Sequence, residues 1–229
     1  MKARSDRLER LDQETPSQEE MKRVVGYLAF VNHWLGGTGA VAYHLRHIHD
    51  PITVLDVAAG AGDIARSLKG RFPNVTMVAL DQSETMLSFG EGLTRVRGDG
   101  RRLPFADKSV DFVTATHFFH HLKDEEIVAT LKEFDRVARR GIIVNDLLRR
   151  HRALAWIYLM TLFANPYVRE DGPLSVRRGF TVPEIQNLAA RSGLDWLKVR
   201  VHFGHRFTLA GERQRMNRQG NVSAAGERY

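Results

Sequence analysis

Three aspartates stand at positions where they could hold a nucleoside. Asp56 lies within an apolar run at 52–57, Asp81 ends a second run at 75–80, and Asp99 stands between two glycines. An acid at the end of a second parallel strand can accept both ribose hydroxyls of a nucleoside. Asp99 can accept from the adenine amino group while the backbone N–H of Gly100 reaches a ring nitrogen. The alternative for Asp99 is a turn aspartate that bonds its own backbone.

The segment after the first apolar run reads Ala-Ala-Gly-Ala-Gly-Asp at 58–63. Gly60 and Gly62 carry no Cβ, so the backbone can turn sharply there and approach a ligand. Asp63 suits the N-terminus of the helix that follows, because a carboxylate is stabilised by free N–H groups and by the positive end of the helix dipole. The same carboxylate opposes a pyrophosphate, so a nucleoside without phosphates fits this turn better than a dinucleotide.

Three histidines, His117, His120 and His121, follow a further apolar run at 110–115. An imidazole with a pKa near ~6.5 suits proton removal at neutral pH. A phenol with a pKa of about 10 is a realistic partner for such a base. The three histidines are therefore candidates for the catalytic base, with packing at the start of a helix as the alternative.

The elements that must position these residues alternate between strands and helices. Near-continuous apolar runs predict buried strands, expected at 52–57, 75–80, 94–96, 110–115 and 141–146. Two further strands, at 196–202 and 206–209, form a closing hairpin whose turn holds His205. Helices are expected after the glycine turn, from Ser83, at 124–137, and from the capping box at 181–184 to Gly193. The helix at 124–137 is expected to be capped by Asp124 and ended by Gly141.

In this order the motifs resemble those of the class I S-adenosylmethionine-dependent methyltransferases, in the small-molecule branch that includes the quinone-biosynthesis methylases. The resemblance covers roughly residues 50–145 and rests on 56–62, Asp81, 98–105, and 109–113 followed by 120–122. It implies an α/β fold with a doubly wound, mostly parallel seven-stranded sheet of the Rossmann-like kind, in the order 3-2-1-4-5-7-6. It also implies S-adenosyl-L-methionine as cofactor and S-adenosyl-L-homocysteine as product. The cofactor-binding residues so implied are Asp56, Ala58, Gly60, Gly62, Asp81, Gln82, Met86, Asp99, Gly100, Arg101 and Thr116.

One position departs from the family pattern. Ala58 stands where the family usually has its first glycine. A small residue fits there provided that the position does not need a positive φ.

The sequence divides into a helical lead and cap at 1–49, a cofactor-binding domain at 50–210 and a disordered tail at 211–229. Residues 1–20 are charged and mixed in sign, which predicts a frayed helix or a disordered lead. Two helices are expected from 19 to 49, broken near the glycines at 36–37. Phe30 and Trp34 lie there at helical spacing; the resemblance implies that they bind substrate as part of a lid, and packing onto the sheet is the alternative.

Residues 147–179 form an insertion before the next helix. A helical stripe from 154 to 162 is stopped at 165–166. The apolar residues of this insertion predict an aromatic or lipid-like acceptor, and buried packing explains part of the same pattern. Asp146 and Arg149 are the candidates for acceptor binding at its start.

Composition limits the partners. The net charge is +7, but the arginines are scattered as pairs among acids, which disfavours a nucleic-acid partner. The absence of cysteine excludes disulfides, thiolate metal sites and the thiol chemistry of pyrimidine C5 methylation, and no metal site is expected. No membrane span and no signal peptide are visible, so a cytoplasmic protein is predicted. The oligomeric state is left open.

The predicted function is transfer of a methyl group to a small aromatic or lipid-like acceptor, at oxygen or carbon, by in-line displacement. Positioning of the reactants is the main catalytic contribution expected, because the methyl group of a sulfonium is already activated. Two alternatives remain. One is an RNA or nucleotide methyltransferase, and the other is a cofactor-binding partner protein without turnover.

Overall fold

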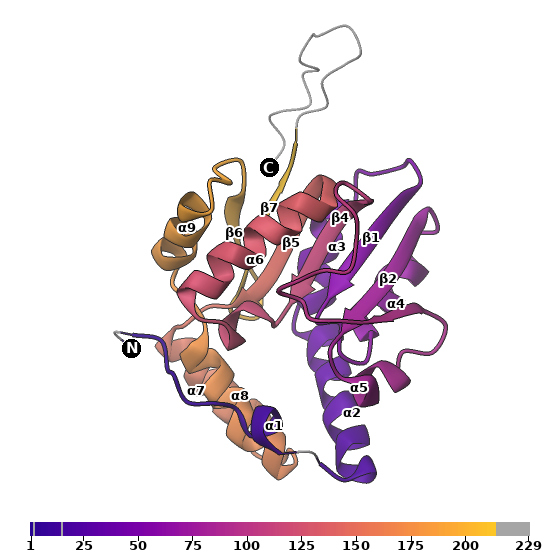
Figure 1. Ribbon diagram of the computed structural model, residues 1–229. Coiled ribbons are helices and arrows are strands. Elements are labelled where there is room, and N and C mark those ends of the chain that lie inside the picture. The colour runs from indigo at the N-terminus through magenta and orange to yellow at the C-terminus, as the bar shows by residue number, and fades with distance from the viewer. Residues whose placement is uncertain (2, 15, 214–229) are drawn as a thin grey trace, which may run out of the picture.

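The computed structural model describes residues 1, 3–14 and 16–213. Within these residues, seven strands form one mixed sheet in the order β3-β2-β1-β4-β5-β7-β6 (Figure 1). Only β7 runs antiparallel to its neighbours, β5 and β6. Both the strand order and the fold class confirm the prediction. The strands are β1 (Ile52–Val57), β2 (Val75–Asp81), β3 (Thr94–Arg97), β4 (Val110–Thr116), β5 (Ala138–Leu147), β6 (Lys198–His202) and β7 (Arg206–Glu212).

Helices cover both faces of the sheet, which explains the near-continuous apolar runs. Successive strand residues point to opposite faces, and in β1 Val54 packs with helices α3 (Gly37–Leu45) and α4 (Asp63–Arg71). Its neighbour Leu55 packs on the other face with α6 (Asp124–Val137) and α9 (Val182–Arg191). Both side chains are completely buried.

A group of helices lies beyond the carboxyl ends of the parallel strands, at the bottom of Figure 1. They are α1 (Arg10–Gln13), α2 (Gln18–Trp34), α7 (His151–Thr161) and α8 (Pro166–Arg178). Ser17 caps α2 in a capping box with Glu20, and Asn165 caps α8 by accepting from the backbone N–H of Val168. These helices form the cap over the edge of the sheet where open α/β folds bind ligands. No helix among the described residues is long and apolar enough to cross a membrane.

The prediction of a frayed or disordered lead is wrong for residues 3–14, here called the N-terminal segment. This segment lies along α8, where Ser5 N–H donates to the carbonyl oxygen of Arg177 at 3.1 Å. The carboxylate of Asp171 accepts from the N–H groups of Arg10 and Leu11 at 2.7 and 3.0 Å, so α8 supplies the cap for α1. The N-terminal segment is rich in charged residues. Helix α8, which is distant along the chain, nevertheless orders it by accepting hydrogen bonds from its backbone N–H groups.

Two boundaries near β5 also differ from the prediction. Lys123 is the N-cap of α6, with Asp124 the first helical residue, and the helix passes directly into β5 at Ala138 instead of ending at Gly141. Gly141 lies within the strand, where an added Cβ would stand 2.5 Å from the carbonyl oxygen of Gly211. Its role is therefore close strand packing and not helix termination.

The disordered tail predicted from 211 does not begin at that residue. Gly211 and Glu212 pair with Ile142 and Gly141 and complete β7. The predicted tail otherwise lies, from residue 214 onward, outside the described residues.

Candidate functional site

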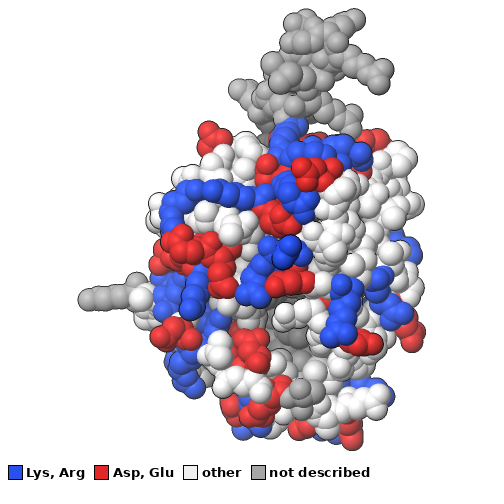
Figure 2. Space-filling view, in the orientation of Figure 1, with Lys and Arg blue, Asp and Glu red and all other residues white. Residues whose placement is uncertain are grey.

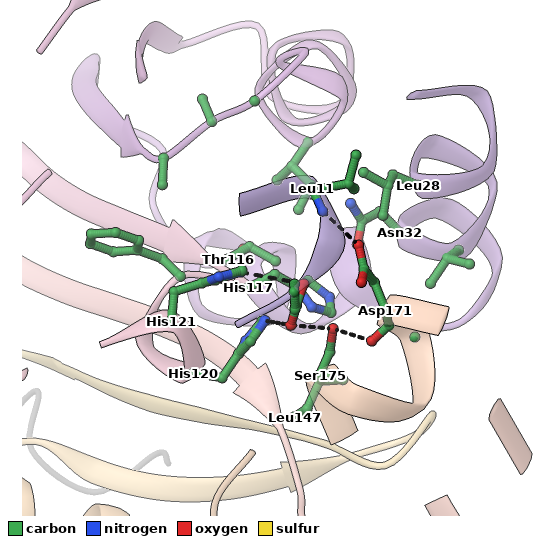
Figure 3. Close-up of a pocket in the computed structure, with 18 of the residues that line it drawn as sticks. Leu11, Leu28, Asn32, Thr116, His117, His120, His121, Leu147, Asp171 and Ser175 are labelled. Atoms are coloured by element: carbon green, nitrogen blue, oxygen red, sulfur yellow. Dashed lines mark hydrogen bonds and ion pairs between the residues drawn. The ribbon is translucent and has the colours of Figure 1, made fainter. Parts of the chain in front are cut away.

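A cavity of about 690 Å³ lies between the carboxyl ends of β1, β2 and β4 and the helices of the cap. Its floor is the glycine turn with the aspartates that follow the strands. Its far wall carries histidines and acids, several of which Figure 3 labels. The apolar lining comes mainly from α2 and α7, through Val24, Tyr27, Leu28, Val31, Trp156 and Ile157. One cavity therefore joins the predicted nucleoside site to an apolar chamber.

The glycine turn has a positive φ at three alternate residues. Gly60 and Gly62 have φ of 55° and 69°, and Ala58 has a φ of 54°. The condition under which alanine was expected to fit at position 58 is therefore not met, and the left-handed conformation costs an alanine about 1–2 kcal/mol. At Gly62 an added Cβ would also stand 2.5 Å from Cδ1 of Leu93. The packing of Leu93 therefore leaves no room for a side chain at Gly62.

Asp81 is tied to the same turn. Its Oδ2 accepts from the N–H of Gly60 and its Oδ1 from the N–H of Ser83, both at 2.8 Å. Each carboxylate oxygen can accept more than one hydrogen bond, so Asp81 retains capacity for two ribose hydroxyls. Met86, on the short helix α5 (Glu84–Ser88), covers the turn, with its Cε 3.2 Å from the place of a Cβ at Gly60.

Asp56 is a buried acid beneath the turn, 2% exposed, whose Oδ1 accepts from the hydroxyl of Thr114 at 2.9 Å. Burial raises the pKa of Asp56 to about 7, and the nearby charges of Asp63 and Asp81 add to this while Thr114 opposes it. A buried carboxyl with a raised pKa at the wall of a cavity is suited to a cationic ligand group.

Two buried polar atoms beside this acid have no hydrogen-bond partner among the described residues. They are Asn32 Oδ1 on α2 and Thr116 Oγ1 at the end of β4, and both residues line the cavity. The amide nitrogen of Asn32 donates to Asp63 at 3.0 Å, which leaves the amide oxygen free. Because buried polar atoms are almost always paired, these two atoms are exceptions within residues that line the cavity.

The loop that carries Asp99 lies against the end of β1. At Gly100 an added Cβ would stand 2.7 Å from Cγ1 of Val57, so only glycine brings the loop this close. Hydrogen bonds from Arg101 lower the pKa of Asp99, and the carboxylate accepts from the Arg101 backbone at 2.9 Å and from its Nη2 at 2.8 Å. Arg101 is held in turn by Glu126 at 3.0 Å.

His117 lines the cavity with its ring nitrogen already engaged. Its Nε2 accepts from the guanidinium of Arg206, which comes from β7. Burial, and then the charge of Arg206, lower the pKa of His117 well below its ordinary value. His117 is therefore neutral, and its lone pair faces a cation instead of the cavity.

His120 is fixed between two buried carboxylates in the 3₁₀ turn Phe119–His121. Its Nδ1 lies 2.7 Å from Oδ1 of Asp146 at the end of β5, and its Nε2 lies 3.5 Å from Oε1 of Glu9. Burial alone would lower the pKa of His120, but Asp146 and Glu9 outweigh it and raise the pKa to about 10. The imidazole is thus held as a cation and is not a free base.

His121 is the most open of the three. Its Nδ1 lies 3.1 Å from Oδ2 of Asp12, and its Nε2 lies 3.9 Å from Oε2 of Glu9. Ser175 on α8 donates to Oε1 of Glu9 at 2.7 Å. His120, His121 and Ser175 point into the same part of the cavity (Figure 3).

The structure brings together nearly all of the residues predicted to bind cofactor. All of them line the cavity except Gly62, which stands behind the turn as the N-cap of α4. The three predicted catalytic histidines line it as well.

The four residues predicted to bind the acceptor are not among those that line the cavity, so their assignment stays a prediction. Phe30 and Trp34 are 47% and 65% exposed, because α2 turns its other apolar face inward. Arg149 is buried and donates to the carbonyl oxygen of Gly179 at 2.7 Å. Asp146 is completely buried and reaches the cavity only through His120.

Several residues of the wall were not found from the sequence. Glu9 and Asp12 lie in the N-terminal segment, Asn32 on α2 and Ser175 on α8. The available signal was Leu8 and Leu11, two apolar residues three positions apart in a charged lead.

Comparisons with known proteins show which proteins this chain is similar to in sequence and fold. Residues 54–141 match a family model described as a methyltransferase domain. The demethylmenaquinone methyltransferase of Thermotoga maritima is 38% identical over 105 residues, which is 43% of this chain and 45% of the relative. The malonyl-[acyl-carrier protein] O-methyltransferase of Methylococcus capsulatus is 34% identical over 105 residues, 42% of this chain and 38% of the relative. The chain thus spans less than half the length of either of these two relatives.

Among solved structures, the chain is similar to a SAM-dependent methyltransferase from Aquifex aeolicus. The TM-score is 0.62 with 18% sequence identity, and the match covers 86% of this chain and 99% of that one. At this identity the similarity shows the fold.

Proposed function

We propose that this chain, in which residues 54–141 match a methyltransferase domain, transfers the methyl group of S-adenosylmethionine to a small aromatic or lipid-like acceptor held in the cavity. The observation that supports this is the continuity of the cavity, which runs from the glycine turn and Asp81 to an apolar chamber with histidines at its far wall. A donor and an acceptor of these two kinds could lie end to end within it.

The cofactor end fits a nucleoside with a cationic amino acid tail. Asp81 would accept the ribose hydroxyls, and Asp99 with Gly100 would read the adenine edge. Asn32 Oδ1, which has no partner among the described residues, and the raised pKa of Asp56 suit an ammonium or sulfonium group nearby. When bound, the cofactor supplies a methyl group on a positive sulfur, which is already activated for transfer.

The acceptor end would position a flat or flexible apolar molecule. Tyr27, Leu28 and Trp156 form an apolar wall, and the N-terminal segment closes one side of the chamber. Alignment of two bound reactants supplies several kcal/mol of rate acceleration. The acceptor's nucleophilic hydroxyl, or the hydroxyl conjugated to its nucleophilic carbon, would face Glu9 and His121 at the far wall of the cavity.

The alternative of an RNA acceptor is less well supported. The cap helices cover the rim of the sheet, and on the face shown in Figure 2 basic side chains lie beside acidic ones. Phosphate binding along a strand needs a connected basic surface. A small acceptor fits the enclosed chamber better.

Calorimetric titration with S-adenosylhomocysteine tests the cofactor assignment. Asp81→Asn replaces one anionic acceptor with a donor, so we expect its affinity to fall at least about tenfold, the loss of roughly one charge-assisted hydrogen bond. The matched control is Asp195→Asn at an exposed position, which should bind like the wild type. Absence of binding by the wild-type protein, or an unchanged affinity for Asp81→Asn, would refute the assignment.

Methyl transfer to phenolic, quinol and polyketide acceptors tests the second half of the proposal. A turnover product with one added methyl group supports it. A protein that binds the cofactor product and methylates nucleotides, or methylates none of these small acceptors, would contradict the assigned acceptor class.

A further inference from the structure

We propose that Glu9, His120 and His121 form a binding site for one divalent transition-metal ion at the acceptor end of the cavity. One ring nitrogen of each histidine and a carboxylate oxygen of Glu9 all lie within 4.8 Å of one another. Two imidazoles and one carboxylate are the donor set of catalytic zinc sites and of non-haem iron sites. The absence of cysteine excludes only thiolate ligands, and this proposal departs from the sequence-based expectation of no metal site.

The two oxygens of the Glu9 carboxylate each face one histidine, at separations close to those of ligands around a shared ion. Metal–nitrogen and metal–oxygen bonds of about 2.0–2.2 Å place neighbouring tetrahedral ligands roughly 3.4 Å apart. His120 Nε2 and Glu9 Oε1 are separated by 3.5 Å, and His121 Nε2 and Glu9 Oε2 by 3.9 Å. Closing the second distance by a few tenths of an ångström requires only a rotation of the His121 ring, which is partly exposed.

Both histidine ligands have a carboxylate at Nδ1, the ring nitrogen that would not bind the ion. Asp146 holds Nδ1 of His120 at 2.7 Å, and Asp12 holds Nδ1 of His121 at 3.1 Å. Both histidines therefore keep a proton on Nδ1 when Nε2 binds a metal, and at His120 the ion displaces the second proton of the imidazolium cation. A carboxylate behind a coordinating histidine is the usual arrangement in metal sites, because it fixes the tautomer and strengthens the ligand.

Hydrogen bonds from α8 also hold the Glu9 side chain and the backbone of the 3₁₀ turn that carries the two histidines. Ser175 donates to Glu9 at 2.7 Å, and the buried Arg178 donates to the carbonyl oxygens of His120 and His121 at 2.9 and 3.0 Å. Two elements distant in the sequence, α8 and the N-terminal segment, thus fix the ligands before any ion binds. Such preorganisation is not needed for histidines that only fill space.

A second group, formed by His117, His120 and Asp146, is a weaker candidate. His117 directs its Nε2 at the guanidinium of Arg206, and a metal ion there would meet that positive charge. Asp146 and His120 already share a hydrogen bond at 2.7 Å. In the first group His120 also pairs with Glu9, but no guanidinium bonds a ligand atom among the described contacts.

The proposed ion would bind and activate the acceptor's hydroxyl group, and this step rests on the proposed function. Three protein ligands leave at least one coordination position open toward the cavity. A phenol or enol oxygen bound there loses its proton to water, because the cation lowers the hydroxyl pKa. The resulting anion forms a bond from oxygen, or from a conjugated carbon, to the methyl carbon, as the carbon–sulfur bond breaks and its electron pair passes to sulfur.

Titration of the full-length, chelator-treated protein with Co²⁺, followed by visible absorption, tests the site, and Zn²⁺ calorimetry measures its affinity. We expect one equivalent of Co²⁺ to bind. Asp12→Asn should weaken binding about 10- to 100-fold, the usual effect of removing a supporting partner. Glu9→Gln and His121→Asn should weaken it at least as much, while His49→Gln, an exposed histidine elsewhere, should bind like the wild type.

The same samples are titrated with S-adenosylhomocysteine, which separates the two proposals and shows that each variant is folded. Cofactor-product binding without stoichiometric Co²⁺ uptake overturns the metal site and leaves the proposed function standing. Equal Co²⁺ binding by Asp12→Asn, Glu9→Gln and the wild type also overturns the site. Failure of the wild type to bind the cofactor product overturns the proposed function instead.

Discussion

Replacement of Asp56 by asparagine should stabilise the cofactor-free protein at alkaline pH. The carboxyl of Asp56 has a pKa of about 7 in the folded chain, raised by burial from 3.8. The folded state therefore binds this proton more tightly than the unfolded state, and its contribution to stability is lost as the pH rises from 3.8 through 7. At 1.36 kcal/mol for each pKa unit, the full loss is about 4 kcal/mol.

The expected gain is smaller than this upper value. The asparagine oxygen can still accept from the Thr114 hydroxyl, but its amide N–H groups need partners, and an unpaired buried donor costs about 1–3 kcal/mol. We therefore expect Asp56→Asn to be more stable than the wild type by roughly 1–3 kcal/mol at pH 8. At pH 5 the advantage should disappear, because Asp56 is then protonated in the folded protein.

Urea unfolding of both proteins without cofactor, at intervals from pH 5 to pH 8, measures the difference. Comparison with the wild type at each pH cancels the titration of all other groups. If the difference in unfolding free energy between the two proteins does not change with pH, the raised pKa of the buried Asp56 carboxyl is refuted. In the same variant the affinity for S-adenosylmethionine should fall more than that for S-adenosylhomocysteine, since only the former carries the positive sulfur.

Two further predictions concern residues outside the acceptor end. Burial, then the charges of His202 and Arg200, lower the pKa of His44 to about 4, so its contribution to stability, about 3 kcal/mol, is lost as the pH falls from 6.5 to 4. Unfolding of His44→Gln should lack that part of the pH dependence, and an unchanged slope would contradict it. Ala58→Gly should raise the melting temperature by about 1–2 °C, because relief of about 1–2 kcal/mol of backbone strain exceeds the roughly 0.5–1 kcal/mol cost of glycine in the unfolded chain. Ala61→Gly is the matched control and should lower it.

The cofactor end was predictable because its signals are local. The glycine turn follows directly from β1, and Asp81 and Asp99 stand at strand ends and loops that the apolar pattern marks. A short segment of sequence contains both the element and the residue it positions. Only the backbone at Ala58 was misjudged, since the φ angle of a turn depends on its neighbours in space and not on residue type alone.

The acceptor end was not predictable for the opposite reason. Asp12 meets His121 across 109 positions of the chain, and Ser175 meets Glu9 across 166. Helix α2 shows why periodicity does not suffice, because its apolar residues occupy two faces. The spacing of Phe30 and Trp34 predicts a helix, yet these two side chains are exposed while Tyr27 and Leu28 line the cavity.

The cofactor end and the acceptor end of the cavity differ in predictability because different parts of the chain form them. The sheet alone fixes the rim that would hold the cofactor, and it also fixes His120 through Asp146 at the end of β5. The N-terminal segment supplies Glu9 and Asp12, and the sheet does not determine where that segment lies; the contacts of Asp171 and Ser175 on α8 do. The acceptor end can therefore vary through the segment and α8 while the cofactor rim keeps its geometry, and under the proposed function the part of the chain that covers the sheet would set the specificity for the acceptor.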